Sequence, residues 1–111
     1  MPVLLTKPGV LFTIISPAGF QIMAALTRVA HIIGHDIEIT SACDGEHSGP
    51  EDPHHKGEAY DIRTHDLPDK HLALATLKSL LDDGKFFAWI EDEGAPNEHL
   101  HVQLRHGMAY P

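Results

Sequence analysis

The chain has 111 residues, of which 42% are hydrophobic, and its formal net charge is −8. This length suffices for one hydrophobic core and is short for two, so residues 1–111 are expected to form a single domain. The sequence contains no block of lysine and arginine residues, which argues against nucleic acid as a partner.

The N-terminal region combines a Lys-Pro-Gly turn with the apolar residues 10–15, which favour a short strand or an extended lead-in to the next element. Prolines bracket this run and no charged leader precedes it. We therefore expect no membrane span, and synthesis in the cytoplasm without a signal peptide. Ser16 can cap a helix, and apolar residues then recur at helical spacing until Gly34. These features predict a helix over residues 17–33.

The central region predicts two strands joined by a long loop. Residues 36–40 alternate polar and apolar side chains, which is typical of a half-buried strand. Residues 44–56 are rich in Gly, Pro, Asp, Glu and His and predict a loop, in which His47 and His55 are candidates for substrate contacts. Residues 58–63 predict a second strand, with Asp61 inside the sheet.

The C-terminal half predicts a second helix and two further strands. The helix is expected to begin at Pro68-Asp69 and to end at Gly84, because leucines recur along one of its faces. Residues 85–90 form an aromatic strand candidate, and residues 99–104 the last strand. The predicted fold is α+β, with two helices packed on a mostly antiparallel sheet.

Two motifs hold the residue types of a catalytic metal site. In His54-His55-Lys56-Gly57-Glu58-Ala59-Tyr60-Asp61 an imidazole and a carboxylate stand seven residues apart, and Glu98-His99-Leu100-His101 follows near the C-terminus. A catalytic zinc ion usually takes three protein ligands and leaves a fourth position for water, so His54, Asp61 and His101 are the candidate ligands. Glu98 is the candidate base for that water. Gly57 and Ala59 are expected to be small so that their neighbours pack close to the metal.

The position of Glu98 admits two arrangements. Residues three apart lie on opposite faces of a regular strand, so Glu98 and His101 converge only if Glu98 still belongs to the preceding turn. Alternatively His99 and His101, which share a face, both approach the metal. His99 is therefore also a candidate for supporting the metal centre or for contacting the substrate.

The pattern His-x-x-Gly-x-Ala-x-Asp, followed by Glu-x-x-His, resembles that of the zinc D-alanyl-D-alanine peptidases and their relatives. These include VanX-type dipeptidases, phage L-alanyl-D-glutamate endopeptidases and the Hedgehog signalling-domain fold. The first motif is especially similar to the murein peptidase branch. The resemblance implies a Hedgehog or DD-peptidase type of fold, Zn²⁺ held by His54, Asp61 and His101, and Glu98 as the base. It also implies that the substrate is a peptide bond in peptidoglycan.

The resemblance leaves several choices open. Family members usually carry an arginine after a Thr-Ser or Ser-Gly pair to hold the substrate carboxylate, and here residues 40–45 contain none. Lys56 or Arg63 are the candidate replacements. Carboxypeptidase, dipeptidase and endopeptidase activities are all compatible with the motifs, as is a zinc-binding domain of the same fold that no longer catalyses. A phage-encoded, endolysin-like enzyme would reach the cell wall through a separate pore.

Overall fold

The computed structural model describes residues 1–44 and 52–105. The elements follow one another as β1 (Leu4–Thr6), α1 (Pro17–Ile33), β2 (Ile37–Ser41), the short 3₁₀ helix η1 (Pro53–Lys56), β3 (Ala59–Arg63), α2 (Lys70–Leu80), β4 (Phe86–Glu91) and β5 (His99–Leu104). His47 lies outside the described residues. None of the described helices is long and apolar enough to cross a membrane.

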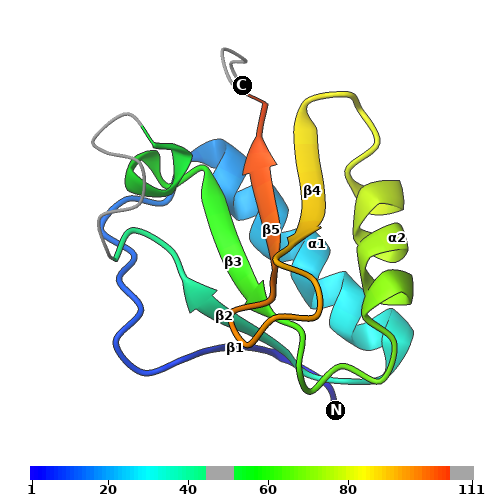
Figure 1. Ribbon diagram of the computed structural model, residues 1–111. Helices are drawn as coiled ribbons and strands as arrows, with labels where there is room; N and C mark the ends of the chain where they lie inside the picture. The colour runs from blue at the N-terminus through cyan, green and yellow to red at the C-terminus, as the bar shows by residue number, and fades with distance from the viewer. Residues whose placement is uncertain (45–51, 106–111) are drawn as a thin grey trace.

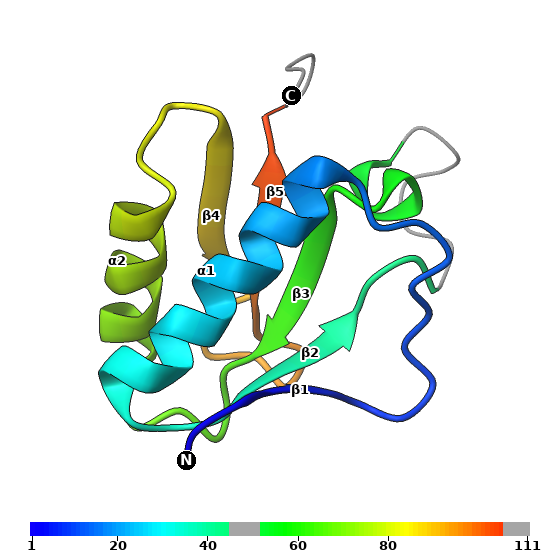
Figure 2. The same cartoon turned by 180° about the vertical axis from the view of Figure 1, so that it is seen from behind.

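The strands form one mixed five-stranded sheet in the order β1-β2-β3-β5-β4. β1 runs parallel to β2, whereas the β2–β3, β3–β5 and β4–β5 pairs are antiparallel. Figure 1 and the reverse view in Figure 2 show that α1 and α2 lie on the same side of the sheet. The opposite side, which faces the viewer in Figure 1, is called the helix-free face below. The α+β class and the two helices are thus confirmed.

The first helix has the predicted bounds because local chemistry fixes both ends. The Ser16 hydroxyl oxygen accepts a hydrogen bond from the Gly19 N–H at 3.0 Å, and Pro17 occupies the first helical turn. At the other end, Gly34 adopts a left-handed conformation with φ 72° and donates its N–H to the Ala30 carbonyl. Sequence-local signals were therefore sufficient for α1.

The second helix is shorter than predicted, since it ends at Leu80 and is followed by turns up to residue 85. Asp69 caps its start by accepting a hydrogen bond from the Leu72 N–H at 3.0 Å. Beyond its end, the Asp83 carboxylate accepts a hydrogen bond from the Lys85 N–H at 3.0 Å. Such a local side-chain bond competes with helical hydrogen bonding and favours a turn.

The predicted strand at residues 10–15 is absent, and the N-terminal strand lies at Leu4–Thr6 instead. Residues 10–15 form the extended lead-in that was the alternative. Leu11 makes isolated hydrogen bonds and not a strand ladder. Its carbonyl accepts a hydrogen bond from the Cys43 N–H, and its own N–H donates to the Asp44 carboxylate. Phe12 in this segment packs against Tyr60, with the ring centroids 5.8 Å apart. Val10 and Phe12 therefore pack on the core, whereas Leu11 and Ile14 are exposed, and none of these residues belongs to a strand.

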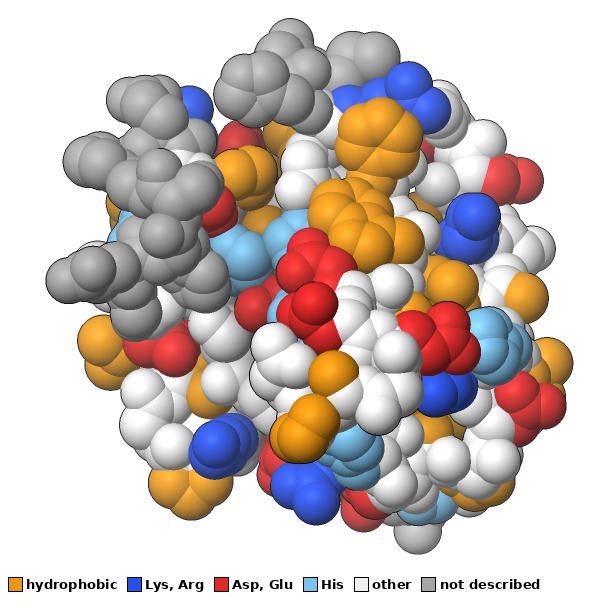
Figure 3. Space-filling view, viewed as in Figure 1, with side chains coloured by type: hydrophobic (Ala, Val, Ile, Leu, Met, Phe, Trp, Pro, Cys, Tyr) orange, Lys and Arg blue, Asp and Glu red, His pale blue; other side chains and the backbone are white. Residues whose placement is uncertain are grey.

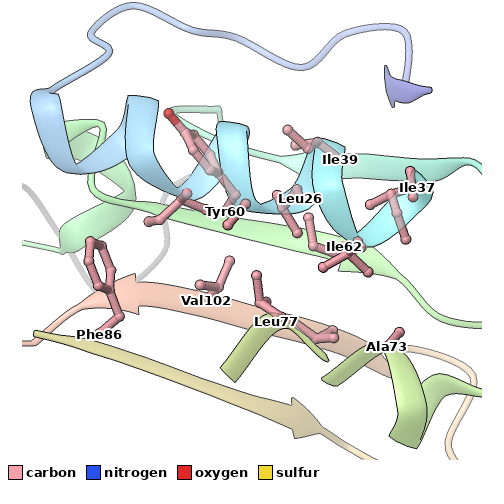
Figure 4. Packing of buried hydrophobic residues seen from close by; sticks show 14 of the residues in the cluster. Leu26, Ile37, Ile39, Tyr60, Ile62, Ala73, Leu77, Phe86 and Val102 are labelled. Atoms are coloured by element: carbon pink, nitrogen blue, oxygen red, sulfur yellow. The ribbon is translucent and has the colours of Figure 1, made fainter. Parts of the chain in front are cut away.

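The hydrophobic core lies between the helices and the sheet, as Figure 4 shows. Along β3 and β5 the core side chains alternate with others that point to the helix-free face. Tyr60, Ile62, Leu100 and Val102 are fully buried in the core. Asp61 and His101, which pair directly across the two strands, consequently project from the helix-free face.

Candidate metal centre

Three elements bring the predicted ligands together on the helix-free face. The Nε2 atom of His54, on η1, lies 3.1 Å from Oδ1 of Asp61 on β3. The Nδ1 atom of His101, on β5, lies 2.9 Å from the same oxygen. All three potential ligand atoms lie within 4.8 Å of one another, so these residues could hold a metal ion.

The short helix η1 orients His54 toward the sheet. Asp52 caps η1 by accepting a hydrogen bond from the His54 N–H at 2.9 Å, and Gly57 ends it with φ 69°. A Cβ atom on Gly57 would lie 2.2 Å from the carbonyl oxygen of Ile14. Gly57 is thus required by its own backbone conformation and by the approach of the lead-in segment, which differs from the expected packing against a metal.

Further contacts fix which ring nitrogen of each histidine carries a hydrogen. The Asp52 carboxylate, which can only accept, lies 2.7 Å from Nδ1 of His54. The Gln103 amide nitrogen donates to the Leu104 carbonyl, which turns Oε1 of Gln103 toward Nε2 of His101 at 2.7 Å. The hydrogens therefore sit on Nδ1 of His54 and on Nε2 of His101, and the two inner nitrogens present lone pairs to Asp61. Such outer partners are typical of metal-binding histidines.

The pKa shifts of His54 and Asp61 indicate that a positive charge is stabilised between these ligands. Burial lowers the pKa of His54, but the Asp61 and Asp52 carboxylates outweigh it and raise that pKa above its ordinary value. Burial raises the pKa of Asp61, whereas the contacts with His101 and His54 lower it well below its ordinary range. With both tautomers fixed, two lone pairs and one carboxylate oxygen meet at hydrogen-bond distance. That arrangement favours a cation, either extra protons on the imidazoles or a metal ion.

A cavity of about 350 Å³ opens in front of the three ligands. Figure 3 shows histidine and acidic side chains gathered there on the helix-free face, next to a hydrophobic patch. The cavity is lined by Asp52, His54, Asp61, Trp89, Glu91, His99, His101 and Gln103.

His99 and Glu91 are the polar groups in this cavity that can act beside the ligands. The Nε2 atom of His99 lies 3.6 Å from Oδ1 of Asp61 and 3.3 Å from Oε2 of Glu91. Glu91, His99 and His101 form a second group that could hold a metal ion. The indole N–H of Trp89 donates to Oε1 of Glu91 at 3.0 Å and so holds that carboxylate in place.

Glu98, the predicted base, is not brought to this cavity. Its carboxylate accepts hydrogen bonds from the Lys70 ammonium at 2.6 Å, from the Gly94 N–H at 2.8 Å and from the Thr64 hydroxyl. Lys70 opens α2, so Glu98 faces the start of that helix. These hydrogen bonds lower the pKa of Glu98 to about 2, and the bond from Lys70 has the largest effect. Because its oxygens are engaged there, Glu98 is not placed to take a proton from water at the candidate centre.

The remaining expectations have mixed outcomes. Arg63, a candidate substrate clamp, lies close to the carboxylates of Glu38 and Asp66 at 3.8 and 3.7 Å. No sequence motif points to Glu91 or Trp89, because only the β4–β5 register places Trp89 beside His101 and Glu91 beside His99. Gln103 stands two residues after His101 in β5, so the alternation of side chains along a strand is the sequence signal that places it on the same face.

Comparison of the chain with protein-family models, with curated proteins and with solved structures finds no match.

Proposed function

We propose that the protein is a zinc-dependent peptidase that hydrolyses a peptide bond in peptidoglycan stem peptides. The observation that carries the metal assignment is the convergence of Nε2 of His54, Oδ1 of Asp61 and Nδ1 of His101, with the hydrogens of both rings held on the outer nitrogens. The peptidoglycan substrate is supported by the resemblance of the two motifs to the murein peptidases.

Zinc fits this donor set better than the harder divalent cations. Imidazole nitrogen is a preferred ligand of zinc, whereas Mg²⁺ and Ca²⁺ prefer oxygen ligands. Three protein ligands beside an open cavity also match the usual composition of a catalytic zinc site. A zinc ion bound there would supply Lewis acidity for the substrate carbonyl and a lowered pKa for its water.

His99 is the residue best placed to move protons. Its Nδ1 atom lies 3.0 Å from the Asn97 carbonyl oxygen, which can only accept, so Nδ1 carries a hydrogen and Nε2 faces the cavity. His99 would accept a proton from the attacking water at Nε2 and return it to the leaving amine. Glu91, 3.3 Å from Nε2, would stabilise the imidazolium in between. In this proposal His99 takes the role expected of Glu98.

Metal content is the first test. Purified protein should retain about one zinc ion per chain after mild dialysis, and His54→Ala should lose it. His31→Ala is the matched control, because His31 is an exposed histidine on α1. Zinc far below stoichiometric in the wild type, with no further loss in His54→Ala, would show that the ligands are misassigned.

Activity on the cell wall is the second test. Mass spectrometry of fragments released from purified murein should show cleavage within the stem peptide. We expect His99→Ala to lower kcat by about 10²–10⁴, the usual contribution of a proton-transfer group, with zinc retained. Glu98→Gln should retain most of the turnover. A zinc-loaded wild type that releases no fragment would instead support a zinc-binding domain without catalysis, which the engagement of Glu98 with Lys70 also favours.

A further inference from the structure

A row of side chains leads from the candidate metal centre along the helix-free face. The ring centroid of Trp89 lies 4.5 Å from that of His101, and the ring centroid of Phe87 lies 6.3 Å from that of Trp89. The guanidinium carbon of Arg105 lies 4.3 Å from the Phe87 ring centroid. We call Trp89, Phe87 and Arg105 the aromatic row. Trp89 pairs with His101 and Phe87 with Gln103, so the row runs along the strands.

The aromatic row is exposed where it borders the cavity. Phe87 and Trp89 retain 42% and 37% of their accessible surface. In Figure 3 the hydrophobic patch over β4 adjoins the histidine and acidic side chains of the cavity. Trp89 also lines the cavity itself, so the patch and the candidate metal centre form one continuous surface. Adjacent exposed aromatic side chains of this kind mark binding surfaces.

Arg105 adds a positive charge at the far end. In the part of the chain that the structure describes, no carboxylate lies within ion-pair distance of its guanidinium, which instead covers the Phe87 ring. Arg63, by contrast, already lies near two carboxylates. Arg105 therefore places a positive charge next to the Phe87 ring, where it can bind an anionic group from outside. A guanidinium binds a carboxylate through two parallel hydrogen bonds.

The length of the row defines what it can bind. Arg105 follows His101 by four residues. Its backbone N–H donates a hydrogen bond to the carbonyl oxygen of Lys85, the residue before β4, at 2.7 Å. An extended chain advances about 3.3 Å per residue, so the backbones of His101 and Arg105 are about 13 Å apart along the strand direction. A carboxylate about four residues from the scissile bond would therefore reach Arg105, while a dipeptide would not.

We propose that the aromatic row binds an extended, carboxylate-bearing segment of the peptide substrate, with Arg105 holding the carboxylate and Trp89 and Phe87 covering the apolar part. This assignment rests on the proposed peptidase function. It identifies Arg105 as the clamp in place of the arginine missing from residues 40–45. It also predicts a preference for longer stem peptides over free dipeptides.

Trp89 is the only tryptophan in the chain, so its fluorescence reports on the row directly. Zinc-loaded protein is mixed in a stopped-flow instrument with a murein stem pentapeptide, or with the same peptide after conversion of its carboxylates to carboxamides. The signal is read before turnover. We expect the wild type to bind the carboxylate form about tenfold more tightly, at the low end for charge-assisted hydrogen bonds. Arg105→Gln should remove this preference.

Two further variants make the result specific. Arg28→Gln removes an exposed arginine on α1 and should keep the full preference. Phe87→Leu should weaken the binding of both peptides, since it removes ring contact and no charge. A preference that survives in Arg105→Gln, or the absence of a saturable Trp89 signal, would overturn the subsite. Intact carboxylate preference without any cleavage would overturn the peptidase function and leave the subsite standing.

Discussion

Replacement of Gly57 by alanine tests the link between the N-terminal lead-in and the candidate metal centre. Gly57 has φ 69°, and an added Cβ would lie 2.2 Å from the carbonyl oxygen and 2.8 Å from the carbonyl carbon of Ile14. Its own carbonyl accepts a hydrogen bond from the Ser16 hydroxyl at 2.9 Å, so the two segments cannot separate without loss. The substitution therefore strains the backbone and forces a backbone shift together.

The expected cost follows from these two effects. The left-handed conformation costs an alanine about 1–2 kcal/mol. Overpacking against a backbone atom that cannot rotate away adds about 1–3 kcal/mol. The free energy of unfolding of native proteins is only about 5–15 kcal/mol, so Gly57→Ala should remove a large share of the stability. His54, whose carbonyl accepts from the Gly57 N–H at 3.1 Å, should move with the backbone and bind zinc more weakly.

Gly34→Ala is the matched control. Gly34 has almost the same φ, 72°, but an added Cβ would meet no atom within 4 Å. It should therefore lose only the conformational cost and keep its zinc affinity. Urea denaturation gives the free energy of unfolding of both variants, and zinc competition with a chelator gives the affinity. If Gly57→Ala is no less stable than Gly34→Ala, the close approach to Ile14 carries no energetic weight.

Three other variants test separate parts of the structure. Tyr60→Phe should leave stability unchanged or raise it by about 1–2 kcal/mol in urea denaturation, because the buried hydroxyl has no hydrogen-bond partner among the described residues. Glu98→Gln should lower the melting temperature at pH 7 but not near pH 2. Folding lowers the pKa of Glu98 to about 2, so its contribution is complete above its ordinary pKa and is lost as the pH falls toward 2. Asp52→Asn should weaken zinc binding about 10–100-fold, as expected for loss of an outer partner of a ligand histidine.

Each of these expectations can fail distinctly. A marked loss of stability in Tyr60→Phe would reveal a partner for the hydroxyl. A melting-temperature difference between Glu98→Gln and wild type that stays constant from pH 7 to pH 2 would remove the ionised carboxylate as its cause. Unchanged zinc affinity in Asp52→Asn would show that Asp52 serves only to cap η1.

Signals local in the sequence were sufficient to predict α1 and the candidate ligands. Contacts between residues far apart in the sequence could not be predicted in this way. Ser16 and Gly34 mark the ends of α1 within the chain's own sequence. The spacing of His54 and Asp61 is equally local. The environment of Glu98, however, depends on Lys70 and Thr64, which lie 28 and 34 residues away.

The same distinction explains the N-terminal strand and the aromatic row. β1 has only three residues and forms by parallel pairing with β2, which leaves no periodic pattern to detect. The approach of Trp89 to His101 depends on the β4–β5 register, and no motif in either strand states it. The sequence shows which side chains are present in both places, but tertiary structure decides which residues they contact.

The candidate ligands are separated by 7 and 40 residues, and they meet only when η1, β3 and β5 are assembled. An unfolded chain cannot present that donor set, so a zinc ion would bind the folded state in strong preference. Free metal at one hundred times its dissociation constant then adds about 2.7 kcal/mol to the free energy of unfolding. The melting temperature would thus become a measure of zinc activity, and chelation would shorten the life of the protein wherever a protease samples its unfolded form.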